Sequence, residues 1–538
     1  MSHKYNQSEY WVLIIVIVVF FLLYLTQLTH YGLWYDEAIE YFYSKFLTGK
    51  VVFSGDTTNM YERICLTYQP PLYNILMYIW LLFFDSEWLF RLPGVIITFV
   101  GSLGIYFGIK HISSWKWGIA GMIVFLMSSS VIYYALECAE YNLLLCMESW
   151  ALYFFIRCLF SYQLKQSNCR NIIGFILFSC LSIYSQYGAV FFVFPLFLIM
   201  LGTFIRKREF NSLKQLIICS LIALIIAGLP LWYFFIRIQM ERQNSLSVSH
   251  HPVFVKNLFY SYFMGLAFNM KWITNGIFVT GKIIMIFHLL ILFITGIMIF
   301  VGVIKKKNPI SYSLLGAFFI SWTLFFIMAS CSYYGYNNWN GQLGFNNVIG
   351  GSRYVLFIVP LTITTCLYGL YVFFNYYTTR KVTIIFALMA LLYVTSGVYT
   401  LFKGINKSSI REAVEVWYNN KCYTKKTVVQ ESDIVTFQFY FRHLPIYNHD
   451  NISQIIETNS RMRTHSNKEM FSYLKRIGVL DLNEFFYIGS YLAPLATNNL
   501  DMIKETIKDA GFSVNYLWKG ESVLFHCKKI NNSLVNEI

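Results

Sequence analysis

The stretch YWVLIIVIVVFFLLYLTQLT, residues 10–29, decides the fold, because it contains no charged residue over a length that crosses a lipid bilayer. As a helix rising about 1.5 Å per residue, it spans roughly 30 Å, the thickness of the hydrocarbon core. It is too long for the apolar core of a signal peptide, and no small-residue cleavage site follows it. We expect a retained membrane anchor that leads directly into YGLWYDEAIEYFYS, residues 31–44.

The composition extends this interpretation to most of the chain. Of 538 residues, 57% are hydrophobic, 19% aromatic and 13% charged, and the mean hydropathy is +0.51. Soluble proteins of this length are more polar, so we predict an α-helical polytopic membrane protein with about 11 transmembrane helices. After residues 10–29, the expected spans are 92–109, 118–135, 142–160, 171–186, 188–205, 214–235, 283–304, 311–331, 354–375 and 382–402.

The distribution of basic residues predicts the orientation in the inner (plasma) membrane. The net charge of +15 would suit a nucleic-acid-binding protein, but the lysines and arginines gather in short clusters between apolar segments. Examples are IRKREFNSLK at 205–214 and IKKKNP at 304–309, whereas the short turns near 138 and 187 carry no lysine or arginine. This pattern excludes a nucleic-acid partner and favours a cytoplasmic N-terminus with an extracytoplasmic C-terminus.

One apolar segment, PPLYNILMYIWLLFF at 70–84, is too short to span the bilayer. We predict a juxtamembrane helix that starts at the two prolines and lies on the outer surface. Residues 30–91 then form a large first extracytoplasmic loop within a transmembrane domain of residues 1–402.

Residues 403–538 are polar enough for a small extracytoplasmic α/β domain. SSIREAVEVWYNN at 408–420 predicts a helix with a serine N-cap, and NNLDMIKETIKDAGF at 498–512 predicts a helix that ends at a glycine. FSVNYLWKGESVLFHC predicts a hairpin around Lys519 and Gly520. The cysteines show no metal-ligand spacing, and a disulfide between Cys422 and Cys527 stays open.

The first candidate for chemistry is the pair Asp36 and Glu37 at the exit of the first span. Carboxylates there can simply mark the polar membrane interface. They are set among Trp34 and Tyr35, however, and Glu40 follows Asp36 by four residues, on the same face if the helix continues. A carboxylate held partly desolvated beside aromatic rings can act as a general base towards a hydroxyl group.

Further candidates stand at other expected outer turns and span ends. Glu137 and Glu140 in YYALECAEYN can share a helix face or merely cap two spans, and Glu148 lies inside a span. Arg91 and Arg353 begin spans on the outer side, where arginine either reaches the lipid headgroups or binds a phosphate. The glycine- and asparagine-rich run NNWNGQLGFNNVIGGS precedes Arg353 and suggests a loop that closes over a substrate.

These motifs occur in an order that resembles a known family. LWYDE, PPLY, DSEWLFRLPG, the E-to-Y turn after the third span, SQYG and RYVLFIVPL follow one another over about residues 10–400. The set resembles the GT-C glycosyltransferases of the protein O-mannosyltransferase and aminoarabinose-transferase branch, including the bacterial family-39-like enzymes. The resemblance implies a GT-C fold and transfer of a sugar from a polyprenyl-phosphate donor to a lipid, glycan or protein acceptor of the cell envelope, outside the membrane.

The resemblance also implies roles for single residues. Asp36 becomes the catalytic base with Glu37 as its partner, Glu137 and Glu140 supply a second carboxylate, and Arg91 and Arg353 contact the donor phosphate. The chain departs from the family pattern at Gln69, where histidine is frequent, and at Ala139, where arginine is frequent. Both differences concern positions that the family pattern places near the donor phosphate. The resemblance leaves open whether a divalent metal takes part.

Three other classes of protein fit the composition. One is a non-catalytic assembly subunit, in which the carboxylates would be dispensable. A polymerase or ligase of lipid-linked glycans would also be basic, polytopic and outward-facing, but would use an oligosaccharide on a diphosphate carrier. A lipid or glycan transporter would be expected to contain internal repeats and helices broken at mid-membrane. The sequence shows neither feature, so the glycosyltransferase hypothesis ranks first.

Overall fold

The computed structural model describes the chain in two compact units. We call Met1–Leu28 with Tyr61–Ile405 the helical unit, and Thr29–Met60 with Asn406–Ile538 the C-terminal unit. The described residues are 7–47, 50–53, 56–59, 70–163, 168–237, 296–297, 300–301, 309–330, 352–377, 380–404, 410–430, 433–447, 455–457, 467–490, 500–520 and 522–530.

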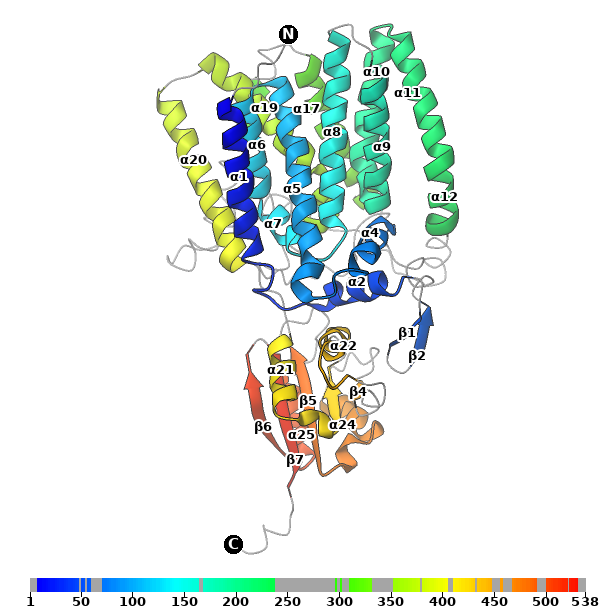
Figure 1. Ribbon diagram of the computed structural model, residues 1–538, viewed down its shortest axis with the longest axis vertical. Coiled ribbons are helices and arrows are strands. Elements are labelled where there is room, and N and C mark those ends of the chain that lie inside the picture. Colours follow the sequence, from blue (N-terminus) through cyan, green and yellow to red (C-terminus); the bar gives the residue numbers. More distant parts are fainter. Residues whose placement is uncertain are drawn as a thin grey trace, which may run out of the picture. The chain divides into compact units, whose positions relative to one another are not determined.

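Long helices run side by side in the helical unit (Figure 1). In chain order they are α1 (Gln7–Leu25), α4 (Leu72–Leu81), α5 (Glu87–Ile112), α6 (Trp115–Leu126), α7 (Ser129–Ala135), α8 (Tyr141–Gln163), α9 (Cys169–Ser185), α10 (Val190–Arg206), α11 (Phe210–Ala223), α12 (Leu229–Leu231), α17 (Pro309–Ser330), α19 (Val359–Tyr377) and α20 (Arg380–Tyr399). Short 3-10 or π segments join or extend them at η1 (Tyr187–Ala189), η2 (Leu224–Gly228), η3 (Trp232–Ile236), η4 (Ser352–Ile358) and η5 (Thr400–Gly404).

The helices confirm a multi-pass membrane protein. Among the described residues, six helices are long and apolar enough to cross a membrane, or seven if the bent pair α6 and α7 is one span. The predicted spans fall on helices except for 283–304, most of which lies outside the described residues. The predicted short helix after Pro70 and Pro71 is confirmed as α4, with Pro71 at its N-cap.

The span predicted at 118–135 is a bent pair of helices instead of one rod. α6 and α7 meet at an angle of 64°. Ser128 has a ψ of 128°, which is extended backbone, and it occupies the N-cap position of α7 without a side-chain capping bond. The serine run at 128–130 provides residues that suit a helix start better than a helix interior.

Close packing between α5 and α8 forms the centre of the bundle. A Cβ atom added at Gly101 would lie 2.9 Å from Cys146 Cα, and one added at Gly104 would lie 2.9 Å from the Ser149 carbonyl carbon. Small residues at these positions let the two helix backbones approach, which is the usual basis of helix association in membranes.

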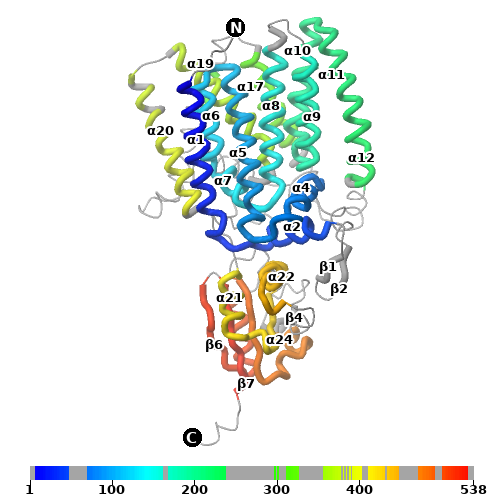
Figure 2. The backbone as a smooth tube through the Cα atoms, in the orientation of Figure 1, coloured from blue at the N-terminus to red at the C-terminus, as the bar shows by residue number. Residues whose placement is uncertain are grey.

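The C-terminal unit combines helices with a five-stranded sheet of order β4-β3-β5-β7-β6. Figure 2 traces its backbone from α21 in yellow to β6 and β7 towards the red end of the scale. The unit also includes α2 and the hairpin β1-β2 from the first loop. Its elements are α2 (Tyr35–Lys45), β1 (Lys50–Phe53), β2 (Asp56–Asn59), α21 (Arg411–Asn419), η6 (Cys422–Thr424), β3 (Thr427–Val429), α22 (Ile434–Arg442), β4 (Ile455–Glu457), α24 (Asn467–Arg476), η8 (Val479–Asp481), β5 (Glu484–Ser490), α25 (Leu500–Asp509), β6 (Phe512–Lys519) and β7 (Ser522–Lys529).

The sheet is mixed, and its topology explains the predicted elements. β3 pairs in parallel with β4 and β5, while β7 pairs antiparallel with β5 and β6. The predicted hairpin is confirmed as β6-β7, and the glycine end of α25 is confirmed by Gly511 with a φ of +88°. The helix at 408–420 is confirmed as α21, but its N-cap is Ile410 and not a serine. Cys422 and Cys527 are both buried free thiols, so no disulfide joins them.

Candidate active site

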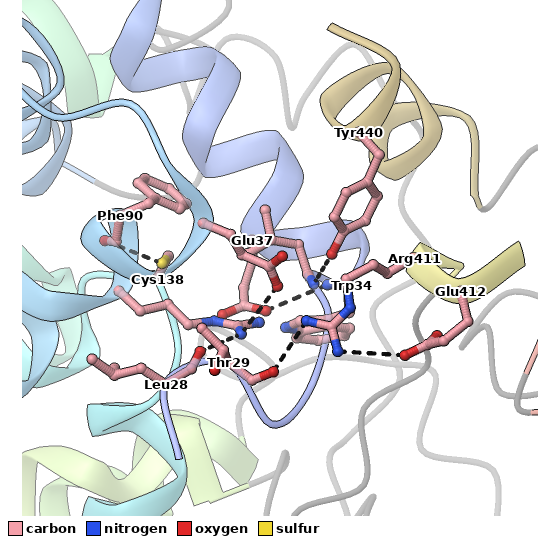
Figure 3. Close-up of polar contacts among 12 residues, drawn as sticks. Leu28, Thr29, Trp34, Glu37, Phe90, Cys138, Arg411, Glu412 and Tyr440 are labelled. Atoms are coloured by element: carbon pink, nitrogen blue, oxygen red, sulfur yellow. Dashed lines mark hydrogen bonds and ion pairs between the residues drawn. The ribbon is translucent and has the colours of Figure 1, made fainter. Parts of the chain in front are cut away.

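The carboxylates at the start of α2 have separate environments. Trp34 is extended, with φ −106° and ψ 177°, and the helix begins at Tyr35. Glu37 is fully buried, and its Oε2 accepts a hydrogen bond from the Trp34 backbone N–H at 3.3 Å (Figure 3). This bond is half of a capping box, so Glu37 fixes the first turn of the helix.

Asp36 lies on the more accessible face of the same helix. Asp36 and Glu40 are both half-buried, one turn apart, whereas Ala38, Tyr41 and Phe42 are buried. The N-terminal turn of a helix favours a negative charge, because its free N–H groups and the helix dipole point there. Asp36 therefore lies in a helix turn that favours a negative charge, and its side chain is partly exposed.

The buried face of α2 packs on α22 of the C-terminal unit. The Tyr41 and Phe439 rings meet edge to face at 4.8 Å between centroids, and the Leu33 N–H donates to the Tyr440 hydroxyl at 2.6 Å (Figure 3). The Arg442 guanidinium lies 5.3 Å from the Phe42 ring and 4.7 Å from the Phe46 ring. These α22 residues are not predictable from the sequence, because no local pattern connects residues 33–46 with residues 439–442.

Glu137 and Glu140 occupy the turn between α7 and α8 in the helical unit. Their side chains are 3% and 4% exposed, which is far less than at an open polar turn. The turn packs on the start of α5, since Cys138 Sγ contacts the Phe90 carbonyl at 3.4 Å (Figure 3). An added Cβ at Gly94 would lie 2.9 Å from the Ala135 carbonyl oxygen, which shows how closely the two segments approach.

Arg91 joins the end of the first span to the start of α5. Its side chain is 2% exposed, its Nη1 donates to the Leu28 carbonyl at 2.9 Å, and it pairs with Glu87 at 3.5 Å. Such burial favours an internal role over a position among lipid headgroups. The structure thus brings Arg91 to the same region of the helical unit as the Glu137 turn, while Asp36 and Glu37 belong to the C-terminal unit.

The remaining candidates are placed only in part. Arg353 lies in η4, but its side chain and the preceding run NNWNGQLGFNNVIGGS fall outside the described residues, except that Ser352 begins η4. Glu148 is fully buried within α8. Within the described part of the chain, no group of three or more His, Cys, Asp or Glu residues could hold a metal ion.

Comparisons with known proteins agree with this architecture. Residues 68–234, from α4 to η3, match the family model described as dolichyl-phosphate-mannose-protein mannosyltransferase. The structure of apo ArnT from Cupriavidus metallidurans superposes with a TM-score of 0.55 at 11% sequence identity, covering 97% of this chain and 98% of that one. The chain has the GT-C fold. The matched segment contains Arg91, Glu137 and Glu140 but not Asp36.

Two further structures superpose on the chain with lower TM-scores. ArnT bound to undecaprenyl phosphate gives a TM-score of 0.49 at 11% identity over 96% of this chain and 98% of that one. Archaeal oligosaccharyltransferase AglB from Archaeoglobus fulgidus, in complex with an inhibitory peptide and dolichol-phosphate, gives 0.46 at 12% identity over 95% and 73%. A search of curated protein sequences finds no match.

Proposed function

We propose that the chain is an inverting glycosyltransferase that moves a sugar from a polyprenyl-phosphate donor to an acceptor hydroxyl on the extracytoplasmic face of the membrane. The observation that carries the proposal is the pair of acids at the start of α2. Glu37 caps the helix and fixes the backbone, while Asp36, one residue earlier, stays half-buried on the accessible face. A matched family named for a dolichyl-phosphate-mannose donor supports a lipid-phosphate sugar as substrate.

The chemistry proposed for Asp36 is general-base catalysis. Its carboxylate takes the proton of the acceptor hydroxyl as the hydroxyl oxygen forms a bond to the anomeric carbon of the sugar. The bond from that carbon to the phosphate oxygen breaks, and its electron pair leaves with the polyprenyl phosphate. A phosphate is a good leaving group, so positive charge near it helps more than a strong acid would. General-base catalysis typically contributes about 10²–10⁴ in rate.

Other residues have supporting roles in the proposal. Arg91 and Arg353 are the candidate contacts to the donor phosphate, and Glu137 and Glu140 are the candidate second carboxylates. Because Arg91 already donates to the Leu28 carbonyl and pairs with Glu87, it would need to share its guanidinium between those groups and the phosphate. Its five N–H donors make such sharing chemically reasonable.

The proposed orientation rests on the basic clusters and one internal contact. Glu9 near the start of α1 contacts both the Lys110 ammonium and the Tyr106 hydroxyl near the end of α5. The start of α1 and Lys110 therefore belong to the same end of the helical unit, as expected if both face the cytoplasm. The C-terminal unit, with Asp36, is then extracytoplasmic.

The function is tested with purified protein and a panel of undecaprenyl-phosphate-linked hexoses and pentoses. We expect the release of undecaprenyl phosphate from at least one donor, a product of inverted anomeric configuration by NMR, and loss of release in Asp36→Asn. Turnover of an oligosaccharide-diphosphate carrier in place of every monophosphate donor would identify a glycan polymerase or ligase. Release at the wild-type rate by Asp36→Asn would remove that residue from the mechanism.

A further inference from the structure

The nine-residue helix α22 of the C-terminal unit carries apolar and aromatic side chains on two opposite faces. Phe437 and Phe441 point to one side, where their rings lie 5.3 Å and 6.0 Å from the Trp417 ring of α21. Phe439 and Arg442 point to another side, towards α2. A helix that is apolar on two faces must be covered on both, and here one cover is its own domain and the other is α2.

Buried hydrogen bonds connect the start of α22, and the neighbouring helix α21, to the sheet. At its start, Asp433 accepts hydrogen bonds from the Ser490 backbone N–H at 2.8 Å and the Ser490 hydroxyl at 2.9 Å. Alongside, Trp417 Nε1 donates to Thr427 Oγ1 on β3 at 2.9 Å. All of these polar groups are buried, so breaking the bonds would leave unsatisfied donors and acceptors. The start of α22 is therefore anchored to β5, and α21 beside it is anchored to β3.

The helices α21 and α22 contact the segment 29–46 at three places. Arg411 Nη1 donates to the Thr29 carbonyl at 3.0 Å, and the Tyr440 hydroxyl accepts from the Leu33 N–H at 2.6 Å (Figure 3). The Arg442 guanidinium then lies among three rings, at 5.3 Å from Phe42, 4.7 Å from Phe46 and 5.5 Å from Tyr447. Asp36 and Glu37 lie between the second and third of these contacts.

We propose that α22 positions the catalytic carboxylate: Tyr440 and Arg442 hold α2 so that Asp36 meets the acceptor hydroxyl. The inference rests on the proposed function and gives the C-terminal domain a task in the same reaction. General-base catalysis requires hydrogen-bond reach to the proton that is removed, and a displacement of 1 Å can cost about 100-fold in rate. The described residues of the segment 29–60 supply only a small sheet and no large core of their own to fix α2 with such accuracy. Their described strands β1 and β2 form only a two-stranded hairpin.

The first arm of the test measures α2 directly in the full-length purified protein. Hydrogen exchange with mass spectrometry is followed over residues 35–45 in Tyr440→Phe, Arg442→Gln and Arg442→Lys. We expect exchange about tenfold faster in Arg442→Gln, a smaller increase in Tyr440→Phe, and recovery towards wild type in Arg442→Lys, which keeps a cation among the rings. Matched controls are Arg476→Gln, since Arg476 lies 5.4 Å from the Tyr473 ring in the same unit, and Tyr516→Phe on β6.

The second arm measures transfer from the undecaprenyl-phosphate sugar that the wild type uses. We expect kcat to fall about tenfold in Arg442→Gln and several-fold in Tyr440→Phe, with KM for the donor within about twofold and with both controls near wild type. A positioning role predicts this split, because the donor site is not altered but the base is displaced. If the unit were sensitive to any substitution, kcat would fall in the two control variants as well.

Specific outcomes overturn the inference. It fails if α2 exchanges at the wild-type rate in Tyr440→Phe and Arg442→Gln, or if kcat stays unchanged in both while Asp36→Asn is inactive. In that last case the proposed function stands without the positioning role. If the wild type releases carrier phosphate from no donor, the proposed function fails, and the exchange arm by itself still decides whether α22 holds α2.

Discussion

The candidate acids of the two units differ in exposure. In the helical unit, Glu137, Glu140 and Glu148 are buried by the packing of membrane helices. In the C-terminal unit, Glu37 has a backbone N–H as partner and Asp433 has two donors from Ser490, while Asp36 keeps partial exposure. Burial therefore does not identify a catalytic base. A base for an external acceptor needs a carboxylate that is fixed at its backbone and still accessible, which is why we propose Asp36 and not one of the buried acids.

The substitution with the largest expected effect is Asp36→Asn, which tests the proposed role of Asp36 as the general base. It removes the proton acceptor but keeps the size of the side chain, so we expect transfer to fall by about 10²–10⁴ with normal yield and thermal stability. Glu40→Gln is the matched control, because it makes the same change of charge one turn along the same helix at similar exposure. Transfer by Glu40→Gln should stay within about threefold of wild type. Equal losses in the two variants would show a general electrostatic effect of α2 instead of a base at residue 36.

A second test addresses the close packing that buries the Glu137 turn. An alanine at Gly94 would place its methyl group 2.6 Å from Asn142 Nδ2 and 2.9 Å from the Ala135 carbonyl oxygen. We expect Gly94→Ala to destabilise the helical unit by about 1–3 kcal/mol, measured as a lower thermal unfolding temperature in detergent. Gly202→Ala is the control, since nothing lies within 4 Å of the added atom. Equal unfolding temperatures for the two variants would mean that the turn is not tightly packed on α5.

Much of the fold was predictable, because each membrane span carries its own signal in apolar length. The hairpin β6-β7 and the glycine end of α25 were predictable for the same reason, since turn chemistry is local. The bend at Ser128 was not, because serine in a membrane helix often bonds to its own preceding turn and leaves the helix continuous.

The candidate site was predictable only as a set of residue types. Glu37 as a helix cap was hidden, because a capping box usually has serine or threonine at the N-cap and this chain has Trp34. The contacts from Tyr440 and Arg442 join segments about 400 residues apart, and no periodicity reports such a pairing. Sequence patterns thus identify the candidate acids, but they do not show which acid is a buried helix cap and which is accessible.

The third test uses Asp433 as a buried carboxylate with a structural role. Burial raises its pKa from 3.8 to about 7, although the Ser490 hydrogen bonds act in the opposite direction. Between about pH 4 and pH 7 the folded protein holds a proton that the unfolded chain has lost, so stability falls as the pH rises through this range. From pH 5 to pH 7 this decline is of the order of 2 kcal/mol for one group.

Asp433→Asn should remove this dependence, because an amide does not titrate. Thermal unfolding of the C-terminal unit, followed at pH 5, 6, 7 and 8 in the full-length protein, should show a smaller decline in the variant than in wild type. The pair of His526 and Glu484 is common to both proteins, so the difference between the two profiles reports Asp433. Identical profiles would show that Asp433 is already ionised in the folded protein at pH 5.

The smallest expected effect separates the two neighbouring acids at the start of α2. Glu37→Gln keeps an oxygen that can accept from the Trp34 N–H, so the cap survives and transfer should fall no more than about threefold. Glu37→Ala removes the acceptor, which typically costs about 0.5–2 kcal/mol of helix stability, and transfer should fall further as α2 loosens. The measurement is transfer rate beside hydrogen exchange over residues 35–45. If Glu37→Gln lost as much activity as Asp36→Asn while α2 stayed protected, the negative charge of Glu37 would belong to the chemistry. The contrast between Glu37 as a helix cap and Asp36 as the proposed general base would then have to be abandoned.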